Sequence, residues 1–483
     1  MLLACGCAST PNVGDAAIDA RLAPDASDVG VDAASIDAWQ HDAASVDAAS
    51  IDALAIDAWL GPAELEDGEL APGGDTTLTS IAAGAFVQPA ANITIASRGD
   101  FQAGTQFFRL AWEIAPGRPE ADGLGPLYNA DACITCHRSN GRAALADVLV
   151  RLASAGGADP SYGDQLEPFG IAGVDGEATP VRNEASVAHV AVDGTLTMLT
   201  QPTYALTDAR YGAPAGDVRL SPRLAPQLVG EGLLEAIDVL DLVALADETD
   251  EDGDGISGRA RWVVRAGAMQ LGRFGWKAGQ PTVEWQTAAA FSGDLGITSP
   301  LFPNETCTSV ELACASAPTG GSPELTTVRL DTTAAYVSLL GVPPRRDGDA
   351  TEVLQGKALF HAVGCASCHH PSFVTSSAAA HVELASQHIW PYTDLLLHDM
   401  GEGLADDGVE PDVAPSEWRT PPLWGLGLLA LVNGEVWLLH DGRARDVDEA
   451  ILWHDGEARA SRLAYEALDV ASRAALARFV SSL

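Results

Sequence analysis

The sequence predicts a mainly α-helical fold of two domains with long loops and minor β structure, preceded by a disordered acidic tether. Three observations lead to this expectation. Short helical patterns at 356–360 and 101–108 precede two Cys-x-x-Cys-His motifs. The pair Pro343-Pro344 interrupts regular structure between the motifs. Asp-Ala pairs recur near the N-terminus. The predicted segments are therefore 1–75, 76–345 and 346–483, with short β elements expected near 77–87 and 189–199.

The N-terminal tether contains an acidic repeat without an apolar face. Its aspartates recur every five residues, at Asp32, Asp37, Asp42, Asp47, Asp52 and Asp57. This period fits neither a helix face nor a strand face, and the alanines offer little surface to offset the entropy of ordering. A solenoid is the alternative, although five residues make a short stacking unit. We expect the repeat to be disordered.

The first residues, Met1-Leu2-Leu3-Ala4-Cys5, resemble the lipobox of bacterial lipoproteins. In such a protein the tether would hold a folded body away from the membrane to which Cys5 is anchored. A charged n-region and a full apolar h-region do not precede the cysteine, so an accidental match is the alternative. The sequence thus predicts membrane attachment only through a lipid anchor.

Charge and hydropathy exclude several classes of protein. The chain carries 67 acidic against 27 basic side chains, a formal net charge of −40. Binding to nucleic acid or to an anionic membrane surface needs clustered positive charge, which this balance argues against. Hydrophobic residues make up 47% of the chain, enough for a substantial core. No stretch approaches the ~20 consecutive apolar residues of a membrane-spanning helix.

The two Cys-x-x-Cys-His motifs carry the predicted chemistry. They are Cys133-Ile-Thr-Cys136-His137 and Cys365-Ala-Ser-Cys368-His369. Two thiols at this spacing can reach both vinyl groups of one haem, and the adjacent histidine can then reach the iron. A zinc half-site or a redox dithiol is the alternative, but neither requires the histidine. The motifs predict two covalently bound haems c, with His137 and His369 as proximal iron ligands.

Cys307 and Cys314 lie in a loop rich in Pro, Thr, Ser and Gly. A disulfide between them is the simplest use of this pair, with two free thiols as the alternative. Because disulfides persist in oxidising compartments, the pair predicts a location in the periplasm or elsewhere outside the cytoplasmic membrane.

From about residue 76 to the end, the chain resembles the di-haem oxidoreductase family of peroxidase-like proteins, also called thiol oxidoreductases. That family is related to bacterial di-haem cytochrome c peroxidases and MauG-type enzymes. Besides the two motifs, the matching stretches are GPLYN (125–129), SPRLAPQL (221–228), GLLEAI (232–237), GRFGWKA (272–278), TDLLLHDMG (393–401), RTPPLWG (419–425) and HDGR (440–443). The resemblance implies two cytochrome c-like haem domains, with electrons passing from the C-terminal haem to a catalytic N-terminal haem.

The resemblance also implies a distal ligand for the C-terminal iron. Peroxidase relatives place this ligand, usually Met, shortly after the His-Asp-Gly motif. Fourteen residues after His440 this sequence has His454, which is therefore the predicted ligand. Met400 is the other candidate for this ligand. Alternatively, His454 is a surface histidine without a role at the iron. Two imidazoles would give this haem a lower potential than imidazole plus thioether.

Further candidates have weaker support. Glu235 lies in an apolar run where burial would raise its pKa, so it could donate a proton to a departing oxygen. A structural role for Glu235 is the alternative. Glu231 is expected to be a solvated charge at the start of the helix. Trp276 could carry electrons between the haems, or could be an ordinary core residue. Arg273 and Arg443 could pair with haem propionates, or with surface acids.

The segment Asp250-Glu-Asp252-Gly-Asp254-Gly255 resembles the opening of a calcium loop. Position 12, normally a bidentate Glu, is Arg261. The segment is therefore either a calcium-binding loop or a simple exposed turn, and both interpretations stay open.

Two functions from different classes remain. One is a peroxidase-like oxidoreductase that uses hydrogen peroxide and receives electrons from a small redox protein, such as a monohaem cytochrome. The acidic chain would suit a basic donor. The other is a non-catalytic electron-transfer cytochrome with both irons six-coordinate. Binding of peroxide or cyanide to a high-spin haem would distinguish them.

Overall fold

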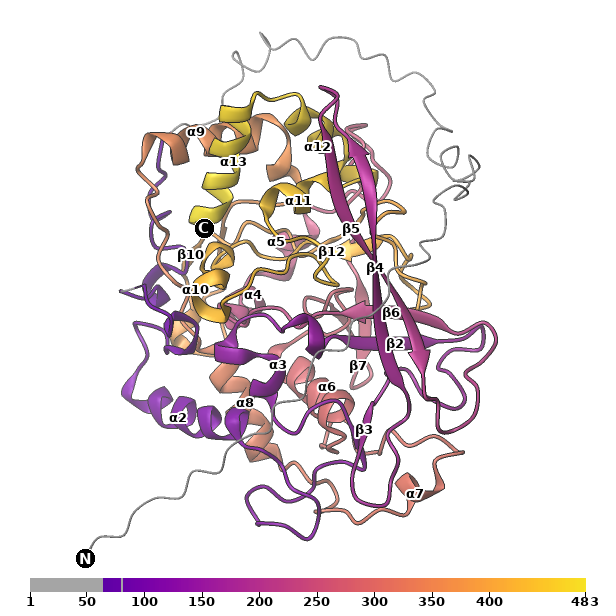
Figure 1. Cartoon of the computed structure of the whole chain (residues 1–483). Helices are drawn as coiled ribbons and strands as arrows, with labels where there is room; N and C mark the ends of the chain where they lie inside the picture. Colours follow the sequence, from indigo (N-terminus) through magenta and orange to yellow (C-terminus); the bar gives the residue numbers. More distant parts are fainter. Residues whose placement is uncertain (1–63, 80) are drawn as a thin grey trace, which may run out of the picture. The chain divides into compact units, whose positions relative to one another are not determined.

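The structure is a computed structural model that describes residues 64–79 and 81–483 (Figure 1). The Asp-Ala repeat and the lipobox-like leader lie outside the described residues. Residues 64–75, which the sequence analysis placed in the tether, pack against the body: the fully buried carboxylate of Glu69 accepts hydrogen bonds from Lys357 Nζ (2.8 Å) and the Tyr392 hydroxyl (2.8 Å), and pairs with Arg345.

Helices are short and scattered along the described chain. The α-helices are α2 (Ile95–Arg109), α3 (Cys133–Cys136), α4 (Glu231–Glu235), α5 (Val239–Val243), α6 (Val283–Leu295), α7 (Leu312–Ala315), α8 (Thr327–Ser338), α9 (Thr351–Ala362), α10 (Leu429–Asn433), α11 (Val447–Leu452), α12 (Arg459–Glu466) and α13 (Val470–Ser482). The 3-10 helices are η3 (Gly74–Thr76), η4 (Ala85–Val87), η5 (Arg138–Asn140), η6 (Leu145–Asp147), η7 (Cys365–Ser367), η8 (Val382–Leu384), η9 (Leu426–Leu428) and η10 (Gly456–Ala458).

The strands form six two-stranded antiparallel sheets within the described residues. The pairs are β1 (Leu127–Tyr128) with β3 (Phe169–Gly170), β2 (Leu149–Ala153) with β6 (Arg219–Arg223), β4 (Thr179–Val190) with β5 (Leu196–Thr207), β7 (Trp262–Arg265) with β8 (Ala268–Leu271), β9 (Phe373–Val374) with β10 (His388–Ile389), and β11 (Leu397–Asp399) with β12 (Glu417–Arg419).

The expectation of a mainly α fold is wrong. The structure is 30% helical and 17% strand. The largest contribution to the difference is the hairpin of β4 and β5, which extends far beyond the turn expected near 189–199 (Figure 1). This hairpin lies outside the helical patterns that precede the motifs, and its side chains alternate between two faces with the period of a strand. The other expected β segment, 77–87, contains the 3-10 helix η4 instead.

Two helix pairs organise the two motifs. Helix α2 packs on α8 near the first motif, and α9 packs on α13 near the second (Figure 1). A glycine stands at each crossing: a Cβ on Gly104 would collide with the Thr332 carbonyl in α8, and one on Gly356 with the Ala475 carbonyl in α13. Close approach of the backbones therefore requires glycine at both positions.

Three of the longer helices begin at threonine caps. The hydroxyl oxygens of Thr94, Thr282 and Thr326 accept hydrogen bonds from backbone N–H groups three residues later, at the starts of α2, α6 and α8. Such caps satisfy donors that the first helical turn leaves free.

The largest apolar cluster draws on both predicted domains. It includes Phe108 and Tyr336 from the first and Trp424 and Trp453 from the second, all buried. The described residues cluster as one compact unit. The division into domains at 76–345 and 346–483 stays a prediction.

Candidate functional site

Each Cys-x-x-Cys-His motif sits on a matching scaffold. The ring of His137 lies 6.2 Å from that of Phe108 in α2, and the ring of His369 lies 6.3 Å from that of Phe360 in α9. These phenylalanines follow Gly104 and Gly356 by four residues, which is one helical turn. In each pair the second helix supplies another aromatic ring against the phenylalanine: Tyr336 at 5.3 Å and Phe479 at 5.2 Å. The same local architecture thus occurs twice.

Both motif histidines are oriented by the backbone. His137 Nδ1 donates to the carbonyl of Pro226 (3.0 Å), and His369 Nδ1 donates to that of Tyr392 (3.0 Å). Burial lowers the pKa of each imidazole to about 4. Both rings are therefore neutral at pH 7, with the lone pair on Nε2. A neutral imidazole whose other nitrogen donates to a carbonyl is the arrangement that metal-ligating histidines use.

The motif cysteines are protonated thiols. None of Cys133, Cys136, Cys365 and Cys368 forms a disulfide in the described chain. Burial raises the pKa of Cys133, Cys136 and Cys365 to about 12 and also raises that of Cys368. A redox dithiol or a zinc site needs thiolates, whose pKa is lowered. The raised pKa of these buried thiols disfavours a redox dithiol and a zinc site, and it is compatible with cysteines that form thioether bonds.

An apolar cavity adjoins the second motif. Its volume is about 180 Å³, and it opens in part to solvent. Cys365, Cys368 and His369 line it, together with His454 and Met400. The cavity also reaches toward the first motif, since its wall includes Gln227, next to the Pro226 carbonyl that orients His137. A planar macrocycle attached at Cys365 and Cys368 would lie in this space.

Both predicted candidates for the distal ligand lie in the wall of this cavity. His454 Nδ1 donates to the carbonyl of Ala450 (2.7 Å), so its Nε2 carries the lone pair, and burial lowers the pKa of the ring. His454 is also close enough to His369 for a positive charge on His454 to lower the pKa of His369. Met400 is half-buried and packs against the main apolar cluster. The geometry brings both residues to the cavity and prepares the histidine for coordination.

His398 is a feature that the sequence analysis passed over, although it lies within the quoted TDLLLHDMG stretch. Its Nε2 is 2.8 Å from Asp394 and its Nδ1 is 2.7 Å from Glu457, so both nitrogens donate and the ring is an imidazolium. These partners raise its pKa well above the ordinary value. The Cys368 sulfur lies 3.6 Å away. His398 thus forms a buried positive charge beside the second motif.

Two arginines in the cavity wall have buried nitrogens without partners. The Nε atoms of Arg142 and Arg462 are buried and make no hydrogen bond among the described residues. Buried polar atoms are almost always satisfied, so such a donor points to a missing acceptor. The two carboxylates of a haem would provide one, and guanidinium matches carboxylate geometry. The residues present therefore fit a haem.

The arginines predicted for this role lie elsewhere. Arg443 is held by the Asp441 carboxylate in a bidentate pair (Nη2–Oδ2, 2.8 Å). Arg273 donates to the carbonyls of Leu234 and Ile237 and lines a second cavity, formed by α4, α6, α8 and residues 376–384. Packing brings the carbonyls of Leu234 and Ile237 to Arg273, whereas Asp441 stands two residues before Arg443 in the chain.

Trp276 lies where the cavity approaches the first motif. Its indole N–H donates to the Leu224 carbonyl (2.8 Å), and the Arg142 guanidinium lies 5.4 Å from its ring centre. The His440 ring is 6.5 Å from it and stacks on Trp418 at 3.8 Å. Burial lowers the pKa of His440 to about 3, so the ring is neutral. A row of aromatic rings thus lines the cavity wall.

Of the two glutamates of α4, only Glu231 differs from expectation. Glu235 accepts a hydrogen bond from the Val283 N–H (2.5 Å) at the start of α6; burial raises its pKa, and it lines the second cavity. Glu231, expected to be solvated, is half-buried, and burial raises its pKa to about 7 against a lowering influence of Arg419. The turn of α4 therefore presents two carboxyl groups that hold protons more tightly than usual.

The calcium-like loop is only partly assembled. Carboxylates of Asp247, Asp250 and Asp252 converge, whereas Asp254 accepts from the Ile256 N–H (2.8 Å). Asp247 already accepts from the backbone N–H of Glu251, which accounts for this turn without a cation. Calcium binding by Asp250, Asp252 and Asp254 stays a prediction.

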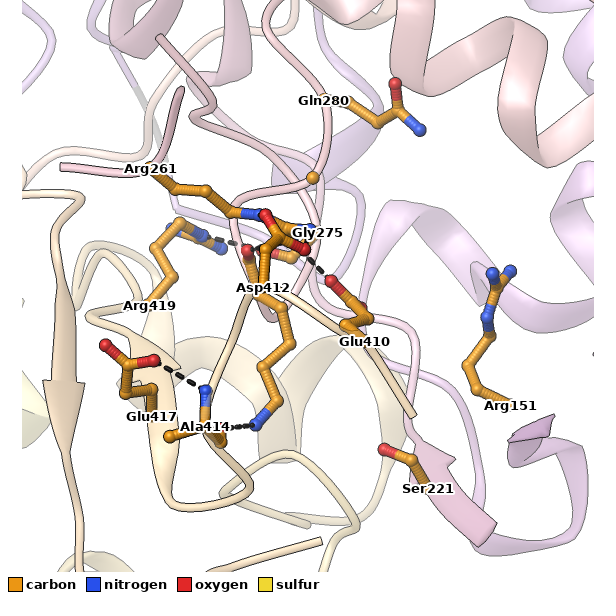
Figure 2. Close-up of polar contacts among 12 residues, drawn as sticks. Arg151, Ser221, Arg261, Gly275, Gln280, Glu410, Asp412, Ala414, Glu417 and Arg419 are labelled. Carbon is orange, nitrogen blue, oxygen red and sulfur yellow. Dashed lines mark hydrogen bonds and ion pairs between the residues drawn. The ribbon is translucent and has the colours of Figure 1, made fainter. Parts of the chain in front are cut away.

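Arg261, at position 12 of that loop, belongs to a separate ion-pair cluster (Figure 2). Its guanidinium pairs with Asp412 (2.8 Å) and Glu410, and it donates to the Lys277 carbonyl (2.6 Å). The same segment is fixed by the Ala414 N–H, which donates to Glu417 (2.7 Å). Arg261 therefore connects the start of β7 to the loop between β11 and β12. Because its charge is used there, it has no place in a cation site.

Cys307 and Cys314 are joined by a disulfide, as the sequence predicts. Among the described residues, no helix has the length and apolar character needed to cross a membrane.

Comparison with known proteins identifies the family. The model of the family described as "di-haem oxidoreductase, putative peroxidase" matches residues 68–153 and 207–483. No curated protein and no solved structure matches the chain. The matched ranges contain both motifs, the cavity that adjoins the second motif and the His440-Asp-Gly-Arg stretch. On this match, which covers most of the chain, the protein belongs to the di-haem oxidoreductase family and is an oxidoreductase that uses haem.

Proposed function

We propose that the protein is a periplasmic di-haem c-type oxidoreductase with peroxidase-like activity. In this proposal electrons enter at the C-terminal haem and pass to the N-terminal haem, where hydrogen peroxide is reduced. The observation that carries the proposal is the joint presence of Cys365, Cys368, His369 and His454 around one apolar cavity. The family match supports oxidoreductase chemistry with haem.

The motif residues hold the two cofactors. Cys133 and Cys136 would form thioethers to one haem, and Cys365 and Cys368 to the other. His137 and His369 would ligate the irons through Nε2, because their Nδ1 atoms are occupied by backbone carbonyls. Haem supplies one-electron chemistry, and an iron with an open axial position can bind peroxide.

His454 would close the sixth position of the C-terminal iron and make this haem an electron-transfer site. Its support is the free Nε2 and the location in the cavity wall. Arg142 and Arg462 would bind the haem carboxylates through their unpartnered Nε atoms. Trp276 would lie on the electron path, since it borders the cavity on the side of the first motif.

Proton delivery would come from α4. General acid catalysis is most effective when the pKa of the acid lies near the working pH. Glu235 was the predicted acid, and burial raises its pKa, but its carboxylate also caps α6. The pKa of Glu231 is about 7. Glu231→Gln and Glu235→Gln would separate the two, because only the proton donor's variant should lose peroxide turnover without losing haem.

Location and partner follow from the disulfide and the charge. The Cys307–Cys314 disulfide supports an oxidising compartment. The net charge of −40 favours a basic partner, and a basic small redox protein such as a monohaem cytochrome would be attracted electrostatically to this acidic protein. A lipid anchor at Cys5 completes the proposal on sequence grounds alone.

Electron paramagnetic resonance of the oxidised protein tests the function. We expect one low-spin signal from the C-terminal haem and one high-spin signal that shifts with cyanide and disappears on addition of peroxide to the half-reduced protein. Two low-spin haems that ignore both ligands would instead establish a non-catalytic electron-transfer cytochrome.

A further inference from the structure

The hairpin of β4 and β5 is an addition to the family pattern. Residues 154–206 lie between the two matched ranges, and the paired strands run from Thr179↔Thr207 to Val190↔Leu196. In the half near the turn, one face of the hairpin packs inward: Val187 contacts the main apolar cluster and Leu199, 3% exposed, belongs to it. Val190, on the other face, is 65% exposed. This half of the hairpin is therefore anchored on the body.

The anchoring contact is polar and reaches α12. His189 Nε2 lies 2.9 Å from Glu466 Oε1, and the backbone N–H of Val192 donates to Glu466 Oε2 (3.0 Å). The Glu466 side chain is 1% exposed. A carboxylate buried this deeply needs such partners, because an unpaired charge at this position would be costly.

Glu466 also faces Arg462, one helical turn earlier in α12. Arg462 Nη1 lies 3.7 Å from Glu466 Oε1, and Nη2 lies 3.4 Å from Asp455 Oδ1. The remaining donor, Nε, is buried without a partner. Arg462 lines the same cavity as Cys365, Cys368 and His454. The guanidinium is thus held from outside the cavity while one donor is left for a group inside it.

We propose that the β4–β5 hairpin is a strap that fixes Arg462, through Glu466, in position to bind a haem carboxylate, and that it thereby sets the reduction potential of the C-terminal haem. The inference rests on the proposed function, since it requires haem in the first cavity. Positive charge near the ring favours the ferrous state, which carries one positive charge less than the ferric state. Loss of Arg462 should therefore lower the potential.

His189 controls how strongly Glu466 attracts Arg462. With His189 in place, the Glu466 carboxylate is shared between the hairpin and the arginine. Without His189, Arg462 becomes its remaining side-chain partner among the described residues and should be drawn toward it, away from the cavity. His189→Ala should then shift the potential in the same direction as Arg462→Gln.

The test is a potentiometric titration of the purified holoprotein, monitored by electron paramagnetic resonance. The signal of the C-terminal haem is assigned by its loss in Cys365→Ala. Arg462→Gln should lower the equilibrium constant for reduction about tenfold, which is ~59 mV for a one-electron couple. His189→Ala should give a smaller shift of the same sign, Arg462→Lys should retain most of the wild-type value, and all variants should keep two covalent haems.

A matched control and a double variant isolate the strap. Glu184→Gln removes the ion pair with Arg182 in the same hairpin without touching Glu466, and should leave the potential unchanged. In the Arg462→Gln background, His189→Ala should have no further effect, because coupled residues are not additive. A His189→Ala shift that persists there, or no shift in His189→Ala with both haems attached, would overturn the strap. Fewer than two covalent haems in the wild-type protein would overturn the proposed function itself.

Discussion

Gly104→Ala in α2 should destabilise the fold, while Gly99→Ala in the same helix should stabilise it. A Cβ on Gly104 would collide with the Thr332 carbonyl and stand 2.5 Å from the Tyr336 Cβ in α8. A Cβ on Gly99 would meet no atom within 4 Å. Both glycines lie inside one helix, so both variants gain the same intrinsic helix propensity, about 0.8–1.0 kcal/mol.

The difference between the two variants isolates the packing at the α2–α8 crossing. Forcing a methyl group against a backbone carbonyl in a packed core costs about 1–3 kcal/mol. Because the propensity gain cancels, Gly104→Ala should be less stable than Gly99→Ala by about this amount. The neighbouring Tyr336 packs on Phe108, which contacts His137, so the strain should also reach the first motif.

Denaturant unfolding of the holoprotein, followed by circular dichroism and by the haem absorbance, measures both effects. We expect Gly99→Ala to unfold at a higher denaturant concentration than the wild type and Gly104→Ala at a lower one. Only Gly104→Ala should alter the spectrum of the N-terminal haem. Equal midpoints for the two variants would refute the role of Gly104 as the contact point of the helices, and Gly356→Ala in α9 would then be expected to be harmless as well.

Further predictions concern the sites. Cys133→Ala and Cys365→Ala should each weaken covalent attachment at one haem, seen by haem staining of denatured protein and by mass; two unaltered thioether-linked haems in both variants would contradict the motif assignment. His454→Ala should convert one low-spin haem to high spin while Met400→Ala leaves the spin state alone; a methionine–iron charge-transfer band that vanishes in Met400→Ala would reverse this assignment. Because burial raises the pKa of Glu231 to about 7, the folded state binds this proton more tightly than the unfolded state. The stability contributed by Glu231 is therefore present below about pH 4.5 and is lost as the pH rises to 7. When the pH rises from 5 to 8, Glu231→Gln should consequently gain roughly 1–3 kcal/mol in free energy of unfolding relative to the wild type. Denaturant unfolding at both pH values measures this gain. If the stability difference between variant and wild type is the same at both pH values, Glu231 stays ionised.

The sequence by itself determined the two Cys-x-x-Cys-His motifs, the family and the Cys307–Cys314 pair. These features are local or nearly so: the spacing within Cys133–His137 and Cys365–His369 is set by one turn of chain, and seven residues separate the disulfide partners. The sequence also places a short helical pattern before each motif, at 101–108 and 356–360. A site whose residues are close together in the chain can be predicted from the order of residues in the sequence.

The tertiary structure decided the fold class and the partners of buried charges. The length of the β4–β5 hairpin depends on packing of Leu199 and its neighbours against a distant core, which the local pattern did not reveal. Arg443 was a plausible haem partner by type, yet Asp441 occupies it, whereas Arg462 is left with a free donor. A buried charge takes whichever partner the fold brings within hydrogen-bonding distance, and residue type alone does not show which acceptors lie within reach.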